Sequence, residues 1–273
     1  MVLRQGGFTL IELIIVIVLL GIVGVSTFSF LGFGTRIYTD SISRDEQVGT
    51  GRFVLERLTR ELEGAYPGSI RISADQRCIE YVPVVAGSLY TQIPRPGSVV
   101  PFQAVTPFEY SFVVEQKQKI AVYALSEAQI YGSTNRIKAL DSITADTPVA
   151  GFTQFNLATD DGPTFQRESP AKRFYVLAQP VSWCVTPGQQ LRRYWNYDWQ
   201  TTQPDLTILP LTGNTAVLAT NIANDLAEPN QQLFHLAATD IRKRTVEVVL
   251  LVGSDITTET LTMHHGVTIA NLP

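Results

Sequence analysis

The chain has 273 residues, of which 45% are hydrophobic and 17% are charged, and its formal net charge is −4. This length suits one or two domains with a substantial core, and the ordinary counts of glycine and proline exclude collagen-like and low-complexity chains. The acidic balance argues against a nucleic-acid-binding surface. A structural zinc site needs about four Cys or His ligands close together, which two cysteines and three histidines do not offer here, so neither a metal site nor a cofactor is predicted.

The apolar residues are concentrated in residues 8–33, where Glu12 is the only charged residue. A helix of this length spans about 39 Å, more than the roughly 30 Å hydrocarbon core of a bilayer. The chain after Gly34 is mixed and polar, so the sequence predicts one N-terminal membrane segment that carries one large body. Arg4 and the initiator amine precede this segment, and positive groups favour the cytoplasmic side, which puts the body across the inner membrane.

Two ordinary explanations of this segment are weaker. A secretory signal peptide has a shorter apolar core followed by a small-residue cleavage site, and no A-x-A site follows residues 8–33. A generic signal anchor remains an alternative, but it leaves Glu12 unexplained. A carboxylate within a transmembrane helix costs about 3 kcal/mol on insertion scales and normally has a partner.

The order GGFTLIE at residues 6–12 resembles the type III signal of type IV pilins and type II secretion pseudopilins. The resemblance implies that a prepilin peptidase cuts after Gly7 and methylates the new N-terminal residue, Phe8. It also implies that the Glu12 carboxylate pairs with the free amine of Phe8 on a neighbouring subunit. The buried charge would then be an assembly device, and the mature chain would keep its apolar helix.

Four regions are expected on this basis. They are a cleaved leader over residues 1–7, the transmembrane half of a helix over 8–34, its periplasmic amphipathic half over 35–66, and a periplasmic β-rich domain over 67–273. Glycines at 21, 24, 32 and 34 would let the membrane half bend or unwind, or would let it pack closely against other helices.

The helix is predicted to continue past the membrane to residue 63. An apolar stripe with spacings of three and four supports this, and Gly64 and Pro67 end it. The stripe consists of Val48, Gly51, Leu55, Leu58 and Leu62. The charged residues are expected mostly on the other faces: Arg44, Glu46, Arg52, Glu56, Arg57, Arg60, Glu61 and Glu63.

After Pro67 the pattern changes to short β-rich runs separated by turn residues. One long helix laid on a large antiparallel sheet is an α+β architecture, and the pilin-like resemblance implies the same fold. The predicted strands are residues 69–73, 77–85, 108–114, 120–125, 173–185, 206–209, 215–220, 245–252 and 259–269.

Cys78 and Cys184 are the only cysteines, and both lie in predicted strands. An even pair in a periplasmic body is best interpreted as one disulfide, and two buried free thiols are the alternative. A catalytic cysteine is not favoured, because no histidine lies close to either one in sequence.

Three further patterns have ordinary structural explanations. His264 and His265 are adjacent on a predicted strand, so one should face inward and the other should face water rather than both binding one metal. The DDG sequence at residues 160–162 lacks the spacing of a calcium loop and is predicted to be a turn. The aromatic cluster at residues 194–199 suits core packing, with a ligand or partner surface as the alternative.

Residues 60–62, 77–83, 180–185 and 266–273 are similar to minor pilins of MSHA-type pilus biogenesis, which are related to J-type minor pseudopilins. The resemblance implies a structural subunit, not an enzyme, whose partners are the prepilin peptidase, other pilins, the assembly platform and membrane lipid. It would join a tip or priming complex, below the outermost subunit because Glu12 is retained. The alternatives are a type II secretion pseudopilin and a membrane-tethered periplasmic enzyme, for which no acid–base or nucleophile pattern was found.

Overall fold

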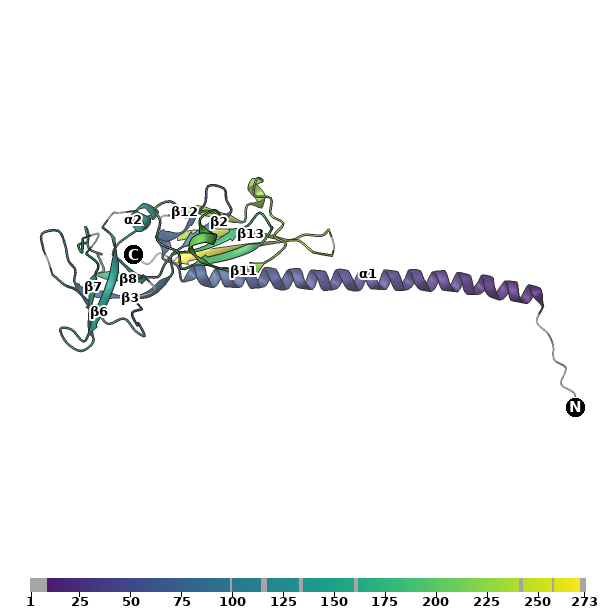
Figure 1. Cartoon of the computed structure of the whole chain (residues 1–273), viewed down its shortest axis with the longest axis horizontal. Coiled ribbons are helices and arrows are strands. Elements are labelled where there is room, and N and C mark those ends of the chain that lie inside the picture. The colour runs from purple at the N-terminus through teal and green to yellow at the C-terminus, as the bar shows by residue number, and fades with distance from the viewer. Residues whose placement is uncertain are drawn as a thin grey trace, which may run out of the picture.

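The computed structural model describes residues 9–98, 100–113, 117–132, 135–159, 162–240, 243–256 and 258–270. Its longest element is helix α1 (Leu10–Glu63), which extends as one rod from a β-rich body (Figure 1). Thr9 caps the start of α1, since its hydroxyl oxygen accepts the backbone N–H of Glu12 at 3.4 Å. Gly64 ends α1 and donates its N–H to the carbonyl of Arg60 at 3.4 Å, so the predicted end of the helix is confirmed.

Within the described residues, only the second half of α1 packs on the body. Its buried face has spacings of three and four residues, and three of its positions belong to the predicted stripe. The face consists of Ser43, Gln47, Gly51, Val54, Leu58 and Leu62. Val48 and Leu55 are half-buried at its edge. The prediction omitted Val54, which is almost fully buried, because a spacing of three or four after Gly51 fits either Val54 or Leu55.

Gly51 lets a strand approach the helix closely. A Cβ atom at this position would lie 2.4 Å from Sδ of Met263, so any larger residue would displace that side chain. A glycine inside a helix weakens it by about 1 kcal/mol relative to alanine, and close packing offsets that cost here.

Two antiparallel sheets share one core with this half of α1. One has the strand order β12-β13-β14, and the other has the order β1-β2-β9-β10-β11. The strands of the three-stranded sheet are β12 (Phe234–Asp240), β13 (Lys243–Val252) and β14 (Leu261–Ala270). Those of the five-stranded sheet are β1 (Arg71–Ile72), β2 (Cys78–Tyr81), β9 (Val181–Val185), β10 (Leu191–Trp195) and β11 (Asn214–Ala219). The short helices η1 (Pro67–Ser69), α3 (Leu209–Thr212) and η3 (Pro229–Gln231) lie in the connections.

Six further strands close into a barrel in the order β3-β4-β7-β6-β5-β8. They are β3 (Val84–Gln92), β4 (Phe102–Val105), β5 (Lys119–Ala121), β6 (Ile137–Ala145), β7 (Phe152–Leu157) and β8 (Arg173–Leu177), with α2 (Glu127–Tyr131) between β5 and β6. The barrel core is aromatic, and the ring of Phe102 lies 5.2–5.9 Å from four other rings. The barrel lies past the C-terminal end of α1, opposite the N-terminus (Figure 1).

The barrel is an insertion into the five-stranded sheet. The chain leaves the sheet after β2, forms all six barrel strands, and returns as β9, which pairs with β2. Cys78 and Cys184 lie directly opposite each other in this pair and form a disulfide. The bridge expected from the sequence is therefore present, and it joins the two strands at the base of the insertion.

The α+β class with antiparallel sheets on a long N-terminal helix is confirmed, although the strands form two sheets and a barrel rather than one large sheet. The predicted strand at residues 206–209 is wrong, because Asp205 accepts the N–H of Thr207 at 2.9 Å and starts a turn that leads into α3. The predicted strand at 108–114 is wrong over its described residues, 108–113. Tyr110 and Phe112 from that loop pack against the barrel core, which explains the aromatic content. The prediction also missed β4, β6, β7, β10 and β12, and it covered only the first two residues of β3.

Removing the disulfide should destabilise the body by up to about 4–5 kcal/mol, because the bridge closes a loop of 106 residues. Denaturant unfolding of the wild type and of Cys78→Ser, each with and without reductant, measures this effect. We expect the difference between the two proteins only under oxidising conditions. An equal difference in the presence of reductant would assign the loss to packing around residue 78.

Candidate functional site

The first half of α1 is uncovered by the described part of the chain. All residues from 10 to 42 are exposed except Gly24 and Thr39, which are half-buried. The exposed residues include large apolar side chains, such as Leu10, which is 76% exposed, and Phe28, which is 79% exposed. Apolar surface costs roughly 25 cal/mol per Å² in water, so another apolar environment must cover this half. It is long and apolar enough to cross a membrane, consistent with single-pass anchoring.

Three threonine hydroxyl groups on this half are satisfied within the helix. Thr27, Thr35 and Thr39 each donate a hydrogen bond to the carbonyl four residues earlier, at 2.8 Å. Such back-bonding removes the need for an outside partner, as a lipid environment requires. Gly21, Gly24, Gly32 and Gly34 lie in unbroken helix, and a Cβ atom at any of them would meet nothing within 4 Å. Space for a second helix is therefore open at all four positions.

Glu12 lies in the first turn of this helix. Its backbone N–H is the donor to the capping hydroxyl of Thr9, and the two residues have the spacing of a capping box. A carboxylate near a helix N-terminus is favoured by the helix dipole. The carboxylate of Glu12 makes no hydrogen bond or ion pair within the part of the chain that the structure describes. Gly7 and Phe8, the predicted cleavage and methylation residues, lie outside the described residues.

The loop between β13 and β14 is fastened to α1 where the helix leaves the body. The side-chain amide of Gln47 donates to the carbonyls of Val252 at 3.2 Å and Glu259 at 3.0 Å. Ser43 shares a hydrogen bond with Ser254 one turn earlier on the helix. These contacts fix the point at which the exposed half begins.

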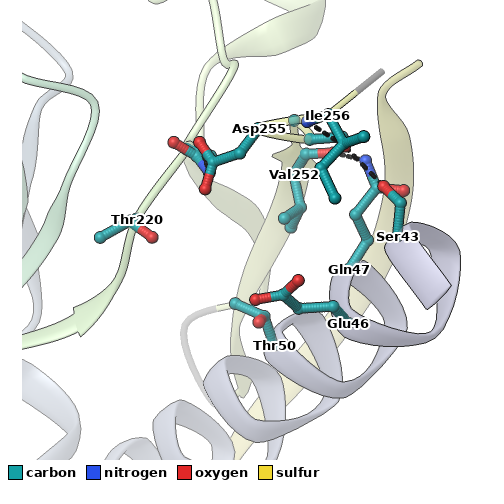
Figure 2. Close-up of a pocket in the computed structure, with 11 residues that line it drawn as sticks. Ser43, Glu46, Gln47, Thr50, Thr220, Val252, Asp255 and Ile256 are labelled. Atoms are coloured by element: carbon teal, nitrogen blue, oxygen red, sulfur yellow. Dashed lines mark hydrogen bonds between the residues drawn. The ribbon is translucent and has the colours of Figure 1, made fainter. Parts of the chain in front are cut away.

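A small polar pocket lies beside this attachment (Figure 2). Glu46 and Thr50 line it from α1, and Thr220 and Asp255 line it from the loops that follow β11 and β13. Its volume of about 30 Å³ leaves room for a single water rather than for an organic ligand.

A second attachment lies near the C-terminal end of α1. The carboxylate of Glu61 accepts the indole N–H of Trp183 at 3.1 Å, the guanidinium N–H of Arg193 at 3.0 Å and the hydroxyl of Tyr81. Arg57, one helical turn earlier, donates to its other oxygen at 3.1 Å. Because Tyr81, Trp183 and Arg193 belong to β2, β9 and β10, one carboxylate joins α1 to three neighbouring strands.

Electrostatics keep this attachment charged. Burial alone would raise the pKa of Glu61, but hydrogen bonds from Tyr81 and Arg193 and the positive charge of Arg193 outweigh it and lower the pKa. Burial and the Glu61 charge raise the pKa of Tyr81 well above its ordinary value. At neutral pH Glu61 is therefore an ionised acceptor and Tyr81 a neutral donor.

Glu61 is the residue that the sequence prediction misplaced, since it was grouped with the exposed faces of the helix. It follows the buried Leu58 by three residues and precedes the buried Leu62, so it borders the packed face. Its place at the border of the packed face was the signal in the sequence that Glu61 could be partly buried. The partners of Glu61 could not be predicted in this way, because they come from strands far away in the sequence.

The other candidates form no metal cluster among the described residues. His265 is half-buried and shares a hydrogen bond with the hydroxyl of Thr59 on α1 at 2.8 Å, whereas His264 is exposed. This alternation agrees with the prediction for a strand. Asp160 and Asp161 lie outside the described residues.

The geometry agrees with what the comparison with known families finds. Residues 3–28 match the prokaryotic N-terminal methylation motif. This motif supports a type IV pilin-like or pseudopilin class and implies processing by a prepilin peptidase and assembly with other pilins. No curated protein and no solved structure matches the chain. The match is confined to the N-terminal segment and does not reach the sheets or the barrel.

Glu61→Gln should lower the free energy of unfolding by about 1–3 kcal/mol, because hydrogen bonds to a charged group contribute about 1.5–3 kcal/mol. Glu63→Gln is the matched control, since Glu63 is exposed in the same turn, and it should change stability by less than about 0.5 kcal/mol. Urea unfolding at neutral pH measures both.

The same pair tests the role of the charge. The folded state lowers the pKa of Glu61, so its contribution is present above the unfolded-state value of about 4.3 and is lost as the pH falls through the lower folded-state value. The gap in stability between the wild type and Glu61→Gln should therefore shrink below about pH 4. A gap that stays constant down to acidic pH would contradict a stabilising carboxylate.

Proposed function

We propose that this protein is a minor pilin of a type IV pilus of the MSHA type, similar to the biogenesis protein MshO. The observation that carries this proposal is the uncovered apolar helix with a single carboxylate in its first turn, in a segment that matches the methylation motif. Such a helix needs lipid before assembly and neighbouring helices afterwards.

In the proposed mechanism the peptidase removes residues 1–7, and the amine of Phe8 becomes the new N-terminus. That amine is methylated and remains a cation. Glu12 of one subunit then pairs with the Phe8 amine of its neighbour, which neutralises a carboxylate that is costly in an apolar environment. The pair fixes the axial position of one helix against the next, while the apolar surfaces supply most of the association free energy.

The proposed location is the inner membrane, with the N-terminus in the cytoplasm and residues 35–273 in the periplasm. Arg4 ahead of the apolar segment supports this orientation. The disulfide between Cys78 and Cys184 supports an oxidising compartment for the body. The partners in this proposal are the prepilin peptidase, other major and minor pilins, the assembly platform and membrane lipid.

A place in the tip or priming complex, rather than in the repeating shaft, is supported by the position of the barrel. The barrel extends past the end of α1 in the direction away from the N-terminus (Figure 1). In a filament whose helices run along its axis, this is the space that the bodies of subunits nearer the tip would occupy, so the barrel suits a subunit with few others above it. Retention of Glu12 suits a place below the outermost subunit, where another subunit lies above.

Processing is tested by the mass of the native membrane form. The proposal requires a chain that begins at Phe8 and carries one added methyl group. Gly7→Val should leave the leader uncut, because a bulky residue replaces the glycine of the signal. Gly6→Val, one residue before the motif glycine, serves as the comparison. A native chain that still begins with Met1, or that is cut after the apolar segment, would contradict the proposal.

Glu12→Gln should be inserted and processed normally yet assemble poorly, because the amide keeps the shape and loses the charge. Piliation, counted by electron microscopy in a strain that carries the variant, is the measurement, and Ile11→Val is the neighbouring control. Wild-type piliation by Glu12→Gln would remove the role assigned to the carboxylate. A loss of secreted proteins with pili intact would instead favour the type II secretion class.

A further inference from the structure

A pocket lies where the barrel meets the loop that follows β10. It has a volume of about 370 Å³, which is within the range of small-molecule sites, and junctions between folded units are common places for such sites. Lys117, Lys119 and Leu140 line it from the barrel side, and Asp198 and Trp199 line it from the loop. A smaller pocket of about 160 Å³ shares Lys119 and is lined by Tyr131, Asn135 and Lys138.

Trp199 carries an unexplained polar atom in this region. Its indole nitrogen is buried and has no hydrogen-bond partner among the described residues. Buried N–H groups almost always have a partner in folded proteins, so this donor calls for an acceptor from outside the described residues. The ammonium of Lys119 lies 4.6 Å from the centre of the indole ring, and a small swing of this flexible side chain would open the ring to a ligand.

The two pockets are rich in cationic donors. Lys119 lines both, and Lys138, only 1% exposed, donates from its ammonium to the side-chain oxygen of Asn135 at 2.6 Å. Lys117 pairs with Asp198 at 2.5 Å at the exposed rim. Three lysines beside one carboxylate are notable in a chain whose formal net charge is −4. A ligand that carries a negative charge matches this arrangement.

Acceptors are present as well, so a simple anion does not match the whole site. The side-chain oxygens of Asp198 and Asn135 accept hydrogen bonds, and the indole N–H of Trp199 needs an acceptor. We propose that the larger of the two pockets, called here the junction pocket, binds an acidic saccharide of the size of a hexuronic acid. Its carboxylate meets Lys119 and Lys117, a ring or hydroxyl oxygen accepts from Trp199, and other hydroxyl groups donate to the acceptors.

The walls of the pocket are held in place by contacts outside it. Arg71 lies 3.6 Å above the ring of Tyr131 and donates to the carbonyls of Thr201 at 2.7 Å and Gln200 at 3.0 Å. These two residues directly follow Trp199 in the chain. The backbone that follows Trp199 is therefore held in place before any ligand arrives, which limits the ordering cost of binding to the movement of Lys119.

Calorimetric titration of the full-length protein in lipid nanodiscs tests the site, with D-glucuronate, D-glucose and acetate as separate probes. Glucuronate should bind saturably, about tenfold or more tightly than either of the other probes, since each lacks one half of the required chemistry. Its affinity should fall as salt is added. Trp199→Phe and Lys119→Met should each weaken glucuronate binding about tenfold.

Trp195→Phe is the matched control. Trp195 is also half-buried and lies 5.1 Å from a cation, the guanidinium of Arg193, but it lines neither pocket. It should bind glucuronate like the wild type. Thermal unfolding of each variant shows whether the body is intact. If Trp199→Phe fails to fold, saturation-transfer NMR of glucuronate on the wild type and on Lys119→Met decides instead.

Three results would overturn the proposal: no saturable binding of glucuronate, equal binding of acetate, or an equal loss in Trp195→Phe. None of them bears on the proposed pilin function, because this pocket lies away from the N-terminal helix. Conversely, a failure of Glu12→Gln to impair piliation would leave the saccharide site untouched.

Discussion

The molecule depends on one constraint, which is that the described part of the chain gives the first half of α1 no apolar cover. From Leu10 to Ile42 the helix is about 50 Å long, longer than the roughly 30 Å core of a bilayer. Lipid can therefore cover only part of it, and the remainder needs other protein. The back-bonded threonine hydroxyls suit both environments, and the open glycine positions suit close approach of a second helix. In the proposed function, Glu12 is the group that responds to a neighbouring subunit, because the Phe8 amine of that subunit would bring a cation into the apolar region.

The pairing of β2 with β9 separates the sheets that share a core with α1 from the barrel. These two strands are neighbours in the five-stranded sheet although the whole barrel lies between them in sequence. The ladder and the disulfide hold the base of the insertion closed, so the sheet that packs on α1 does not depend on the barrel for its continuity. Since the barrel is carried on two adjacent strands, changes within it leave the packing contacts of α1 with the sheets unaltered.

The sequence predicted what is encoded locally. Capping residues predict the end of α1, and the spacing of apolar residues predicts its packed face. The presence of only two cysteines in the sequence predicts that they pair. The barrel was missed because residues 77–85 and 173–185 each look like one strand, whereas Pro83 and Pro180 divide them between the sheet and the barrel. Prolines inside a strand pattern were the available warning. Glu61 and the junction pocket could not be predicted, because their partners converge from separate strands and loops.

The buried ion pair of Arg71 and Glu80 shows how the barrel is oriented. Burying two charges is costly, and such a pair adds little net stability unless its remaining groups are satisfied. Here they are: Arg71 also binds two carbonyls and the ring of Tyr131, and Glu80 accepts the hydroxyl of Tyr197 at 2.9 Å. Burial raises the pKa of Glu80, and the positive charge of Arg71 opposes that rise. These directional contacts link β1, β2, the barrel helix α2 and the loop after β10. Because hydrogen bonds are directional, this network restricts the angle between the barrel and the five-stranded sheet more than apolar packing alone would.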